Sequence, residues 1–200
     1  MNEYDSNRIY DIVKEIGYTR TEKSDEANCY IINTCHIREK ATEKVYHDVG
    51  RVKKNFRNKK KPIVIIAGCV AQAEGEILLK KEKYIDAVVG PQSYHRLSET
   101  LKKIESNSMS IDSTEFEVIE KFDNLNLIKN SDSNISSFLT IQEGCDKFCK
   151  FCVVPYTRGA EFSRPLEDIY AETYDAVKKG CMEVTLLGQN VSSYESSIYA

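Results

Sequence analysis

The sequence lacks a long apolar run, an apolar segment near its first residue and a strong net charge. Its longest apolar stretch, from Ile63 to Ala71, is far shorter than the ~18–20 residues that a membrane helix requires. The opening "MNEYDSNRIY" contains no signal-peptide core. We therefore expect a cytoplasmic protein with no membrane partner. The formal net charge of -3 gives no global attraction to nucleic acid, so binding of that kind requires a local patch.

Internal repeats and low-complexity tracts are also absent. Hydrophobic residues make up 41% of the chain and charged residues 30%, a composition that excludes wholesale disorder. Two hundred residues are enough for one large domain, or for one domain and part of another.

Helical and strand-like patterns alternate over the first hundred residues. Helices are predicted at Asn2–Ile16, His36–Phe56, Gln72–Lys83 and Tyr94–Ile104, and strands at "NCYIIN", "PIVIIAG" and "DAVVG". This order predicts an α/β domain over residues 1–105, with a parallel sheet flanked by helices. Ligands are expected at the carboxyl ends of such strands, where Cys35 and Cys69 stand.

A second unit is predicted after a polar connector. Residues 106–135 are rich in Ser, Asn and Asp, which is typical of a linker. Residues 136–200 then contain a strand at "SSFLTIQ", a helix at Leu166–Lys179 and a strand at "EVTLLG". One and a half βα units cannot close a barrel, so we expect either a truncated second domain or a partner that completes it.

Seven cysteines is a high and odd number for a chain with no export signal, and it favours metal binding or catalysis over disulfides. Three of them, Cys145, Cys149 and Cys152, stand at spacings of four and three in "QEGCDKFCKFCVVPYTRG". A structural zinc site needs four protein ligands, and ferredoxin clusters also use four cysteines. Three thiolates suit a [4Fe-4S] cluster with one open iron, with zinc, a thiol redox pair or unligated core cysteines as alternatives.

The spacing C-x-x-x-C-x-x-C after a predicted strand resembles the cluster motif of radical S-adenosylmethionine (SAM) enzymes. The flanking segments resemble, over essentially all 200 residues, the bacterial tRNA methylthiotransferases. The segments that carry this resemblance are "NTCHIREKATEKVYHDVGR", "GCVAQAEGE", "VVGPQSYHRL", "EGCDKFCKFCVVPYTRGAEFSRP" and "EVTLLGQNV".

The resemblance implies a methylthiotransferase N-terminal domain followed by the start of a radical SAM (β/α) partial barrel. It implies methylthiolation at C2 of N(6)-isopentenyladenosine beside the anticodon, with two SAM molecules and no side-chain acid or base. The implied partners are tRNA, SAM and an electron donor such as flavodoxin or ferredoxin. The alternatives are a sister enzyme acting on threonylcarbamoyladenosine or a ribosomal-protein aspartate, or a non-catalytic iron-sulfur or zinc module that binds RNA or passes electrons.

The resemblance also assigns site residues. Cys145, Cys149 and Cys152 would hold a [4Fe-4S] cluster whose open iron binds SAM. Cys35 and Cys69 would be two of the three ligands of an auxiliary [4Fe-4S] cluster. Its third ligand is expected in an upstream strand ending in Gly-Cys, so we expect a chain truncated at both ends and inactive alone. The expected cofactor-binding side chains are Phe151 against the adenine, Arg158 and Arg164 at the SAM or RNA face, and Gln189 and Asn190 in the SAM pocket.

Other features keep a plainer interpretation beside a functional one. For Phe151 the alternative is packing in the core, and for Arg158 and Arg164 it is a solvated loop. Cys29 and Cys181 are predicted to be core residues. The basic run "RVKKNFRNKKK", residues 51–61, suits either contact with tRNA phosphates or a solvated helix end.

Overall fold

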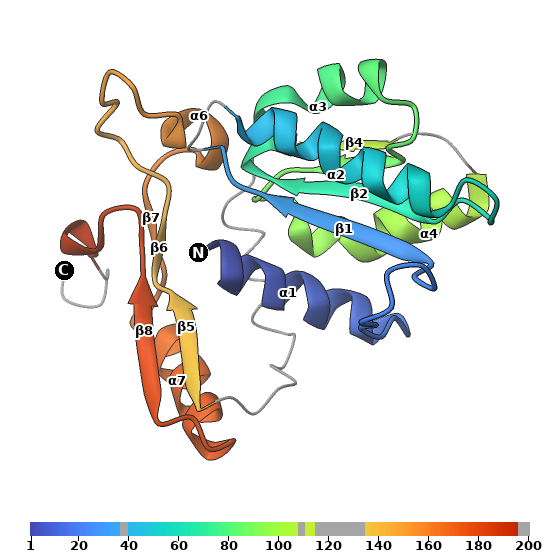
Figure 1. Ribbon diagram of the computed structural model, residues 1–200. Helices are drawn as coiled ribbons and strands as arrows, with labels where there is room; N and C mark the ends of the chain where they lie inside the picture. The colour runs from blue at the N-terminus through green and yellow to red at the C-terminus, as the bar shows by residue number, and fades with distance from the viewer. Residues whose placement is uncertain (37–39, 108–110, 115–134, 196–200) are drawn as a thin grey trace.

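The computed structural model describes residues 1–36, 40–107, 111–114 and 135–195 (Figure 1). Its first unit contains a four-stranded sheet in the order β1-β2-β3-β4, and every pair in it is parallel. The predicted α/β fold with a parallel sheet is thus confirmed. The elements of this unit are α1 (Asn2–Glu15), β1 (Cys29–Thr34), α2 (Ala41–Asn55), β2 (Ile63–Gly68), α3 (Cys69–Lys81), β3 (Ala87–Val89), the 3-10 turn η1 (Tyr94–Arg96), α4 (Leu97–Asn107) and β4 (Ile111–Ser113).

Helices cover both faces of this sheet. On β2, Ile65 and Ala67 point into a core formed with α1 and α4, whereas Val64 and Ile66 point into a second core formed with α2 and α3. This alternation follows from the pleat of a strand, and it explains why β2 is apolar at almost every position. Figure 1 shows the resulting three layers, with α2 and α3 on one side of the strands and α1 and α4 on the other.

Several elements begin at other residues than predicted. The helix expected from His36 begins at Ala41, and α3 begins at Cys69 rather than Gln72 and has a kink at Glu74. The expected helix from Tyr94 starts as a 3-10 turn before α4. The largest difference is β4, which pairs with β3 inside the segment predicted to be a connector. Residues 115–134 of that segment lie outside the described part of the chain.

The second unit has two smaller sheets of two strands each within the described residues. Its elements are β5 (Ser136–Thr140), β6 (Gln142–Glu143), α6 (Val154–Arg158), β7 (Phe162–Ser163), α7 (Leu166–Lys178), β8 (Glu183–Leu187) and the turn η2 (Val191–Ser193). Strands β5 and β8 pair in parallel through the crossover helix α7, and β6 pairs antiparallel with β7. The core of this unit is formed by Leu139, Ile141 and Ile169.

Helix α1 lies between the two units. It packs on α4 and β1 of the first unit and also contacts β5 of the second (Figure 1). Within the described ranges, no helix combines the length and the apolar character needed to cross a bilayer.

Candidate functional site: two cysteine sites at the junction

Cys35 and Cys69 follow neighbouring strands at the same edge of the sheet. Thr34 pairs with Gly68 in the register of β1 and β2, and each is followed directly by its cysteine. The Thr34 hydroxyl donates to the Ala67 carbonyl at 2.6 Å and accepts from the Val70 amide at 3.3 Å, which ties the two strand ends together. The structure therefore confirms that both cysteines stand at strand ends.

A glycine fixes the backbone before Cys69. Gly68 has φ +92°, a conformation that side chains with a Cβ rarely adopt. A Cβ at this position would also lie 2.3 Å from the Thr34 carbonyl oxygen. Only glycine allows β2 to turn into α3 here, so the direction of Cys69 depends on it.

The loop of Cys145, Cys149 and Cys152 is closed by a similar turn. Gly144 has φ +76°, and a Cβ there would lie 1.9 Å from the Ala160 carbonyl oxygen. The Cys145 amide donates to the Gly159 carbonyl at 3.2 Å, and the Cys152 amide donates to the Cys149 carbonyl at 2.9 Å. Cys149 is exposed, while Cys145 and Cys152 are partly buried, so all three thiols are reachable at the surface.

Gln189 and Asn190 lie against this loop. The Gly144 amide donates to the Gln189 side-chain oxygen at 3.1 Å, and the Asn190 amide donates to the Gln142 side-chain oxygen at 3.1 Å. The end of β8 is thus held next to the turn that precedes Cys145. Contact of these two residues with SAM stays a prediction.

All seven cysteines are free thiols. Throughout the described ranges, no three His, Cys, Asp or Glu side chains are grouped closely enough to hold a metal ion. The donor chemistry nevertheless fits iron-sulfur clusters, because thiolates are the ligands that these clusters prefer. Ligation by Cys35, Cys69, Cys145, Cys149 and Cys152 stays a prediction.

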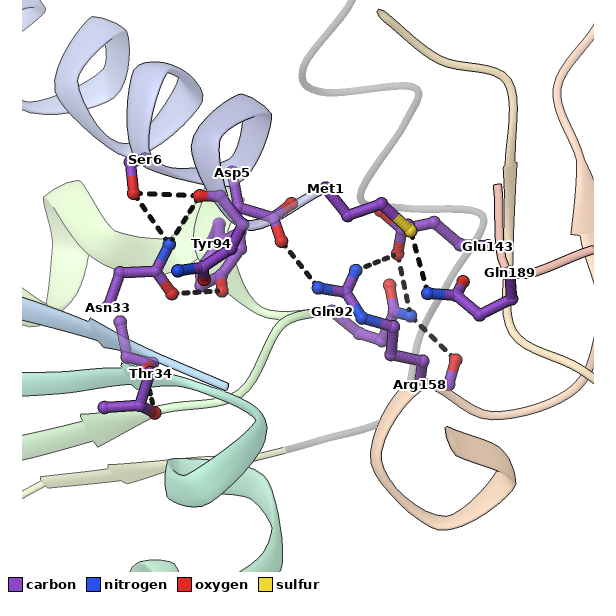
Figure 2. A network of polar contacts seen from close by, with 12 residues as sticks. Met1, Asp5, Ser6, Asn33, Thr34, Gln92, Tyr94, Glu143, Arg158 and Gln189 are labelled. Carbon is purple, nitrogen blue, oxygen red and sulfur yellow. Dashed lines mark hydrogen bonds and ion pairs between the residues drawn. The ribbon is translucent and has the colours of Figure 1, made fainter. Parts of the chain in front are cut away.

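Arg158 and Arg164 are buried, so the alternative of a solvated loop is wrong. Arg158 is 5% exposed, and its Nη2 lies 2.6 Å from Asp5 Oδ2 while its Nη1 lies 3.3 Å from Glu143 Oε2. The Gln92 side chain donates to the Arg158 carbonyl at 2.8 Å and to Glu143 Oε2 at 3.2 Å. Figure 2 shows these groups meeting between α1 and α6.

Arg164 belongs to a second buried cluster. It is 1% exposed, and its Nη2 lies 2.8 Å from Glu172 Oε2 while its Nη1 donates to the Thr140 carbonyl at 2.7 Å. Arg8 of α1 also pairs with Glu172, and the Tyr4 hydroxyl lies 3.4 Å from Arg164 Nη1. Both arginines therefore already have carboxylate partners in this chain, and contact with a cofactor stays a prediction.

Charge and burial compete in these clusters. Burial favours the neutral form of Glu172, but Arg8 and Arg164 outweigh it and lower the pKa of that carboxyl. Burial likewise opposes the charge of Arg158, yet Asp5, Glu143 and Cys69 raise its pKa above the usual range. Burial raises the pKa of Tyr4 to about 12. The lowered pKa of Glu172 and the raised pKa of Arg158 both favour the charged forms.

The two cysteine sites lie on elements that contact each other at the junction of the units. Helix α3, which begins at Cys69, contacts α6, which follows Cys152 almost directly. Cys69 is also close enough to Arg158 to raise the pKa of its guanidinium. Figure 2 follows a polar network across this junction, from Thr34 and Asn33 on β1 to Asp5, Arg158, Glu143 and Gln189.

Phe151 is 96% exposed, so its interpretation as a core residue is wrong. The rings of Phe148 and Tyr156 stand edge to face beside it along the chain, with centroids 6.2 Å apart. The cysteine loop therefore presents aromatic faces on which a planar base could stack. Contact of Phe151 with adenine stays a prediction.

Cys181 is a core residue, as predicted, whereas Cys29 is partly buried at the edge of the core. Cys29 packs against the core of the first unit, and burial raises the pKa of its thiol to about 12, which disfavours the thiolate that a metal needs. Cys181 is buried and its thiol donates to the Glu183 carbonyl at 3.1 Å.

The basic run at residues 51–61 lies at the other end of the sheet. It precedes Ile63 at the start of β2, whereas Cys69 follows the end of that strand about 20 Å away, at ~3.3 Å per residue. Lys59 pairs with Asp25 at 2.9 Å and Lys61 with Asp86 at 2.5 Å. This position favours the interpretation as a solvated helix end.

The buried partners of the arginines were not found from the sequence. Asp5, Arg8, Gln92, Glu143 and Glu172 are ordinary polar residues within predicted helices, strands or loops. A weak signal was available in "QEGC", where a carboxylate directly precedes the Gly-Cys turn. Nothing in the local pattern shows that these side chains are buried.

Comparison with known protein families gives a match to the first part of the chain. Residues 1–90 match the family described as "Uncharacterized protein family UPF0004". These residues are thus similar to UPF0004, the methylthiotransferase N-terminal domain, and the resemblance predicted from the sequence is confirmed.

Particular relatives are similar over nearly the whole chain. The chain is 62% identical over 194 residues to the "tRNA-2-methylthio-N(6)-dimethylallyladenosine synthase" of Pelagibacter ubique (strain HTCC1062), which covers 97% of this chain and 44% of the relative. Synthases of the same name from Rickettsia akari (strain Hartford) and Neorickettsia sennetsu (strain ATCC VR-367 / Miyayama) are 50% and 48% identical, covering 97% and 99% of this chain and 44% and 43% of their own lengths. The chain thus spans less than half the length of these curated relatives.

Proposed function

We propose that this chain provides the two cluster-binding sites of a tRNA methylthiotransferase that modifies C2 of N(6)-isopentenyladenosine beside the anticodon. The observation that carries this proposal is the junction itself, where α3, the helix that begins at Cys69, contacts α6, the helix that follows Cys152. The printed names of the relatives, which state a 2-methylthio product in tRNA, support the choice of reaction and substrate.

The residues would divide the work between two clusters. Cys145, Cys149 and Cys152 would hold a [4Fe-4S] cluster that binds SAM, and Cys35 and Cys69 would hold an auxiliary [4Fe-4S] cluster with a third thiolate. When bound, the clusters and SAM supply the radical and sulfur chemistry that an unreactive C2-H bond requires.

The chain's own part is to hold and orient these groups. Gly68 and Gly144 set the direction of the cysteines that follow them, and Gln189 holds the turn at Gly144 through its amide. Phe151 would lie against the adenine of SAM, with Gln189 and Asn190 at the same pocket. The proposed partners are tRNA, SAM and an electron donor such as flavodoxin or ferredoxin, and the cytoplasmic location stays a prediction.

Arg158 and Arg164 were predicted to lie at the SAM or RNA face. Their carboxylate partners within the chain favour a role in joining the units, since a guanidinium that already pairs with buried carboxylates has less capacity for a ligand. A direct contact with SAM would require one of these ion pairs to open.

The first test is anaerobic reconstitution of Cys149→Ala beside Cys181→Ala. Loss of one of only three thiolates should remove most of the iron of this site, about four atoms for one cubane cluster, whereas the core variant should keep its iron. SAM should also change the electron paramagnetic resonance signal of the reduced wild-type cluster. A stable four-iron cluster in Cys149→Ala, or a signal that ignores SAM, contradicts the proposal and favours a non-catalytic iron-sulfur module.

The substrate is tested by mass spectrometry of tRNA nucleosides from a strain that lacks the gene. Loss of the methylthio group from isopentenylated adenosine is expected, and the wild-type gene, but not Cys149→Ala, should restore it. Loss of a different modification, or of none, would assign the gene to a sister enzyme that acts on threonylcarbamoyladenosine or on a ribosomal protein.

A further inference from the structure

One buried guanidinium touches both sides of the junction. Arg158 is the last residue of α6, and its neighbour Gly159 accepts the hydrogen bond from the Cys145 amide at 3.2 Å. The chain therefore leaves the cysteine loop and returns to it at Gly159, with the next residue, Ala160, packed against Gly144. Arg158 stands where this loop is closed.

Three separate elements hold Arg158 in place. Asp5 of α1 and Glu143 of β6 pair with its guanidinium, and Gln92, just before η1, donates to its carbonyl. Asp5 and Gln92 belong to the first unit, whereas Glu143 precedes the Gly-Cys turn of the second. One side chain thus joins the cysteine loop to the unit that carries Cys69.

We propose that Arg158 is a positioning residue that fixes the Cys145–Cys152 loop against the strand end of Cys69. Its planar fork can face two carboxylates in different directions, which the point charge of a lysine does less well. A neutral side chain would leave Asp5 and Glu143 buried beside each other without their shared cation.

Arg164 provides a matched comparison. It is as deeply buried as Arg158 and also pairs with a carboxylate, but its partner Glu172 lies on α7 and its backbone partner, Thr140, on β5. Through Arg8 this second cluster joins α1 to α7, whereas the cluster of Arg158 joins α1 and the residues before η1 to α6 and β6. Loss of Arg164 removes a partner of Glu172 inside the second unit and leaves the pair of Arg8 and Glu172 in place, so the cysteine sites should keep their mutual position.

The consequence for catalysis rests on the proposed function. If groups held at the two cysteine sites must both reach one substrate atom, a displacement of ~1 Å can reduce the rate by a factor of about 100. Arg158 would then act through the position of the loop, without touching the substrate.

The native cysteines supply a test that needs neither cluster nor substrate. In the reduced, cluster-free protein, a short bismaleimide should cross-link Cys69 to thiols of the Cys145–Cys152 loop, and peptide mass spectrometry measures the yield. Arg158→Gln should lower this yield by roughly tenfold or more, because breaking a buried ion pair shifts the docking equilibrium strongly. Arg158→Lys, which keeps the charge, should recover part of it.

Two controls separate positioning from general loss of structure. The cross-link between Cys35 and Cys69 lies within one sheet and should stay constant in every variant. Arg164→Gln should keep the yield between Cys69 and the loop within about twofold of wild type, since its cluster contacts other elements. Asp5→Asn, a milder change in the same cluster as Arg158, should lower the yield in the same direction if Arg158→Gln fails to fold.

The outcomes decide between three cases. A wild-type yield in both Arg158→Gln and Asp5→Asn, or equal losses in Arg158→Gln and Arg164→Gln, would overturn the positioning role. A fall confined to Arg158 and Asp5 supports it. If the wild-type protein then failed to bind clusters anaerobically, the proposed function would fail while the positioning result stood.

In holoprotein whose auxiliary cluster has its third thiolate, the magnetic interaction between the two reduced clusters gives an independent readout. Arg158→Gln should weaken this interaction at unchanged iron content, and Arg164→Gln should not. An unchanged interaction in Arg158→Gln would count against the proposal.

Discussion

The two units differ in where they keep their apolar side chains. The first unit buries one core on each face of its sheet, whereas the core of the second is formed by Leu139, Ile141 and Ile169. Among the described residues, all the exposed large apolar side chains except Ile77 lie at or beyond residue 135. A unit with so little apolar burial gains little from it, at roughly 25 cal/mol per Å². We therefore infer that the charge clusters with α1 contribute much of the free energy that holds the second unit in place.

The strongest way to break this arrangement is to remove the carboxylate between two arginines. Glu172→Ala leaves Arg8 and Arg164 buried without their shared partner, and it should cost about 3–5 kcal/mol in the free energy of unfolding. Urea unfolding followed by circular dichroism measures the loss. Glu167→Ala, on the exposed side of the same helix, is the control and should change little. Equal losses in the two variants would show that the buried cluster contributes no more to the free energy of unfolding than an exposed carboxylate does.

A pair of core truncations sharpens the comparison between the units. Ile66→Ala removes a side chain that is 0% exposed between α2 and α3, and it should cost about 2–5 kcal/mol. Ile169→Ala, at a position 8% exposed in the smaller core, should fall at the low end, about 2 kcal/mol, because its neighbours can relax into the space. A larger loss from Ile169→Ala than from Ile66→Ala in urea unfolding would reverse our view of the two cores.

Acid should weaken the junction through Glu172. Its pKa is lowered in the folded protein, so its contribution to stability is fully present above its ordinary pKa of 4.5 and is lost as the pH falls through the lowered value. The melting temperature of the wild type should thus decline below about pH 4.5. Glu172→Gln carries no titrating group there and should show a shallower decline. Parallel curves for the two proteins would exclude Glu172 as the source.

The smallest effect is expected at an exposed ion pair of the first unit. Lys80 lies 2.7 Å from Glu76 on the surface of α3, and both side chains are largely solvated. Water and salt screen such a pair, so Lys80→Ala should leave the melting temperature unchanged within error. A clear decrease that disappears in high salt would show that this pair matters more than its exposure suggests.

Local patterns were enough to predict the sheet. The run "PIVIIAG" is apolar throughout because β2 has helices on both faces, and Cys35 and Cys69 follow strands whose ends meet at one edge. By contrast, β4 has only three residues, "IDS", which is too short to show an alternating pattern. Only its pairing with Ala87–Val89 identifies it as a strand. The strand was therefore hidden in a segment predicted to be a connector.

The partners of the arginines could not be predicted for a different reason. Asp5 and Arg158 are 153 residues apart in the chain, and Arg8 and Glu172 are 164 apart. Short-range periodicity carries no information about contacts over such separations. The sequence did indicate that Arg158 and Arg164 bind anionic groups, and the structure shows which carboxylates pair with them.

The long separation of these partners has a consequence during synthesis. A ribosome adds ~5–20 residues per second, so roughly 10–30 s pass between the appearance of Arg8 and that of Glu172. During this interval the nascent α1 can pack its apolar side on the first sheet, while its charged side still faces water because Arg158 and Glu172 have not yet been synthesised. The first unit can therefore fold before the second is complete. In this order of synthesis, α1 is already in place when the second unit packs against it.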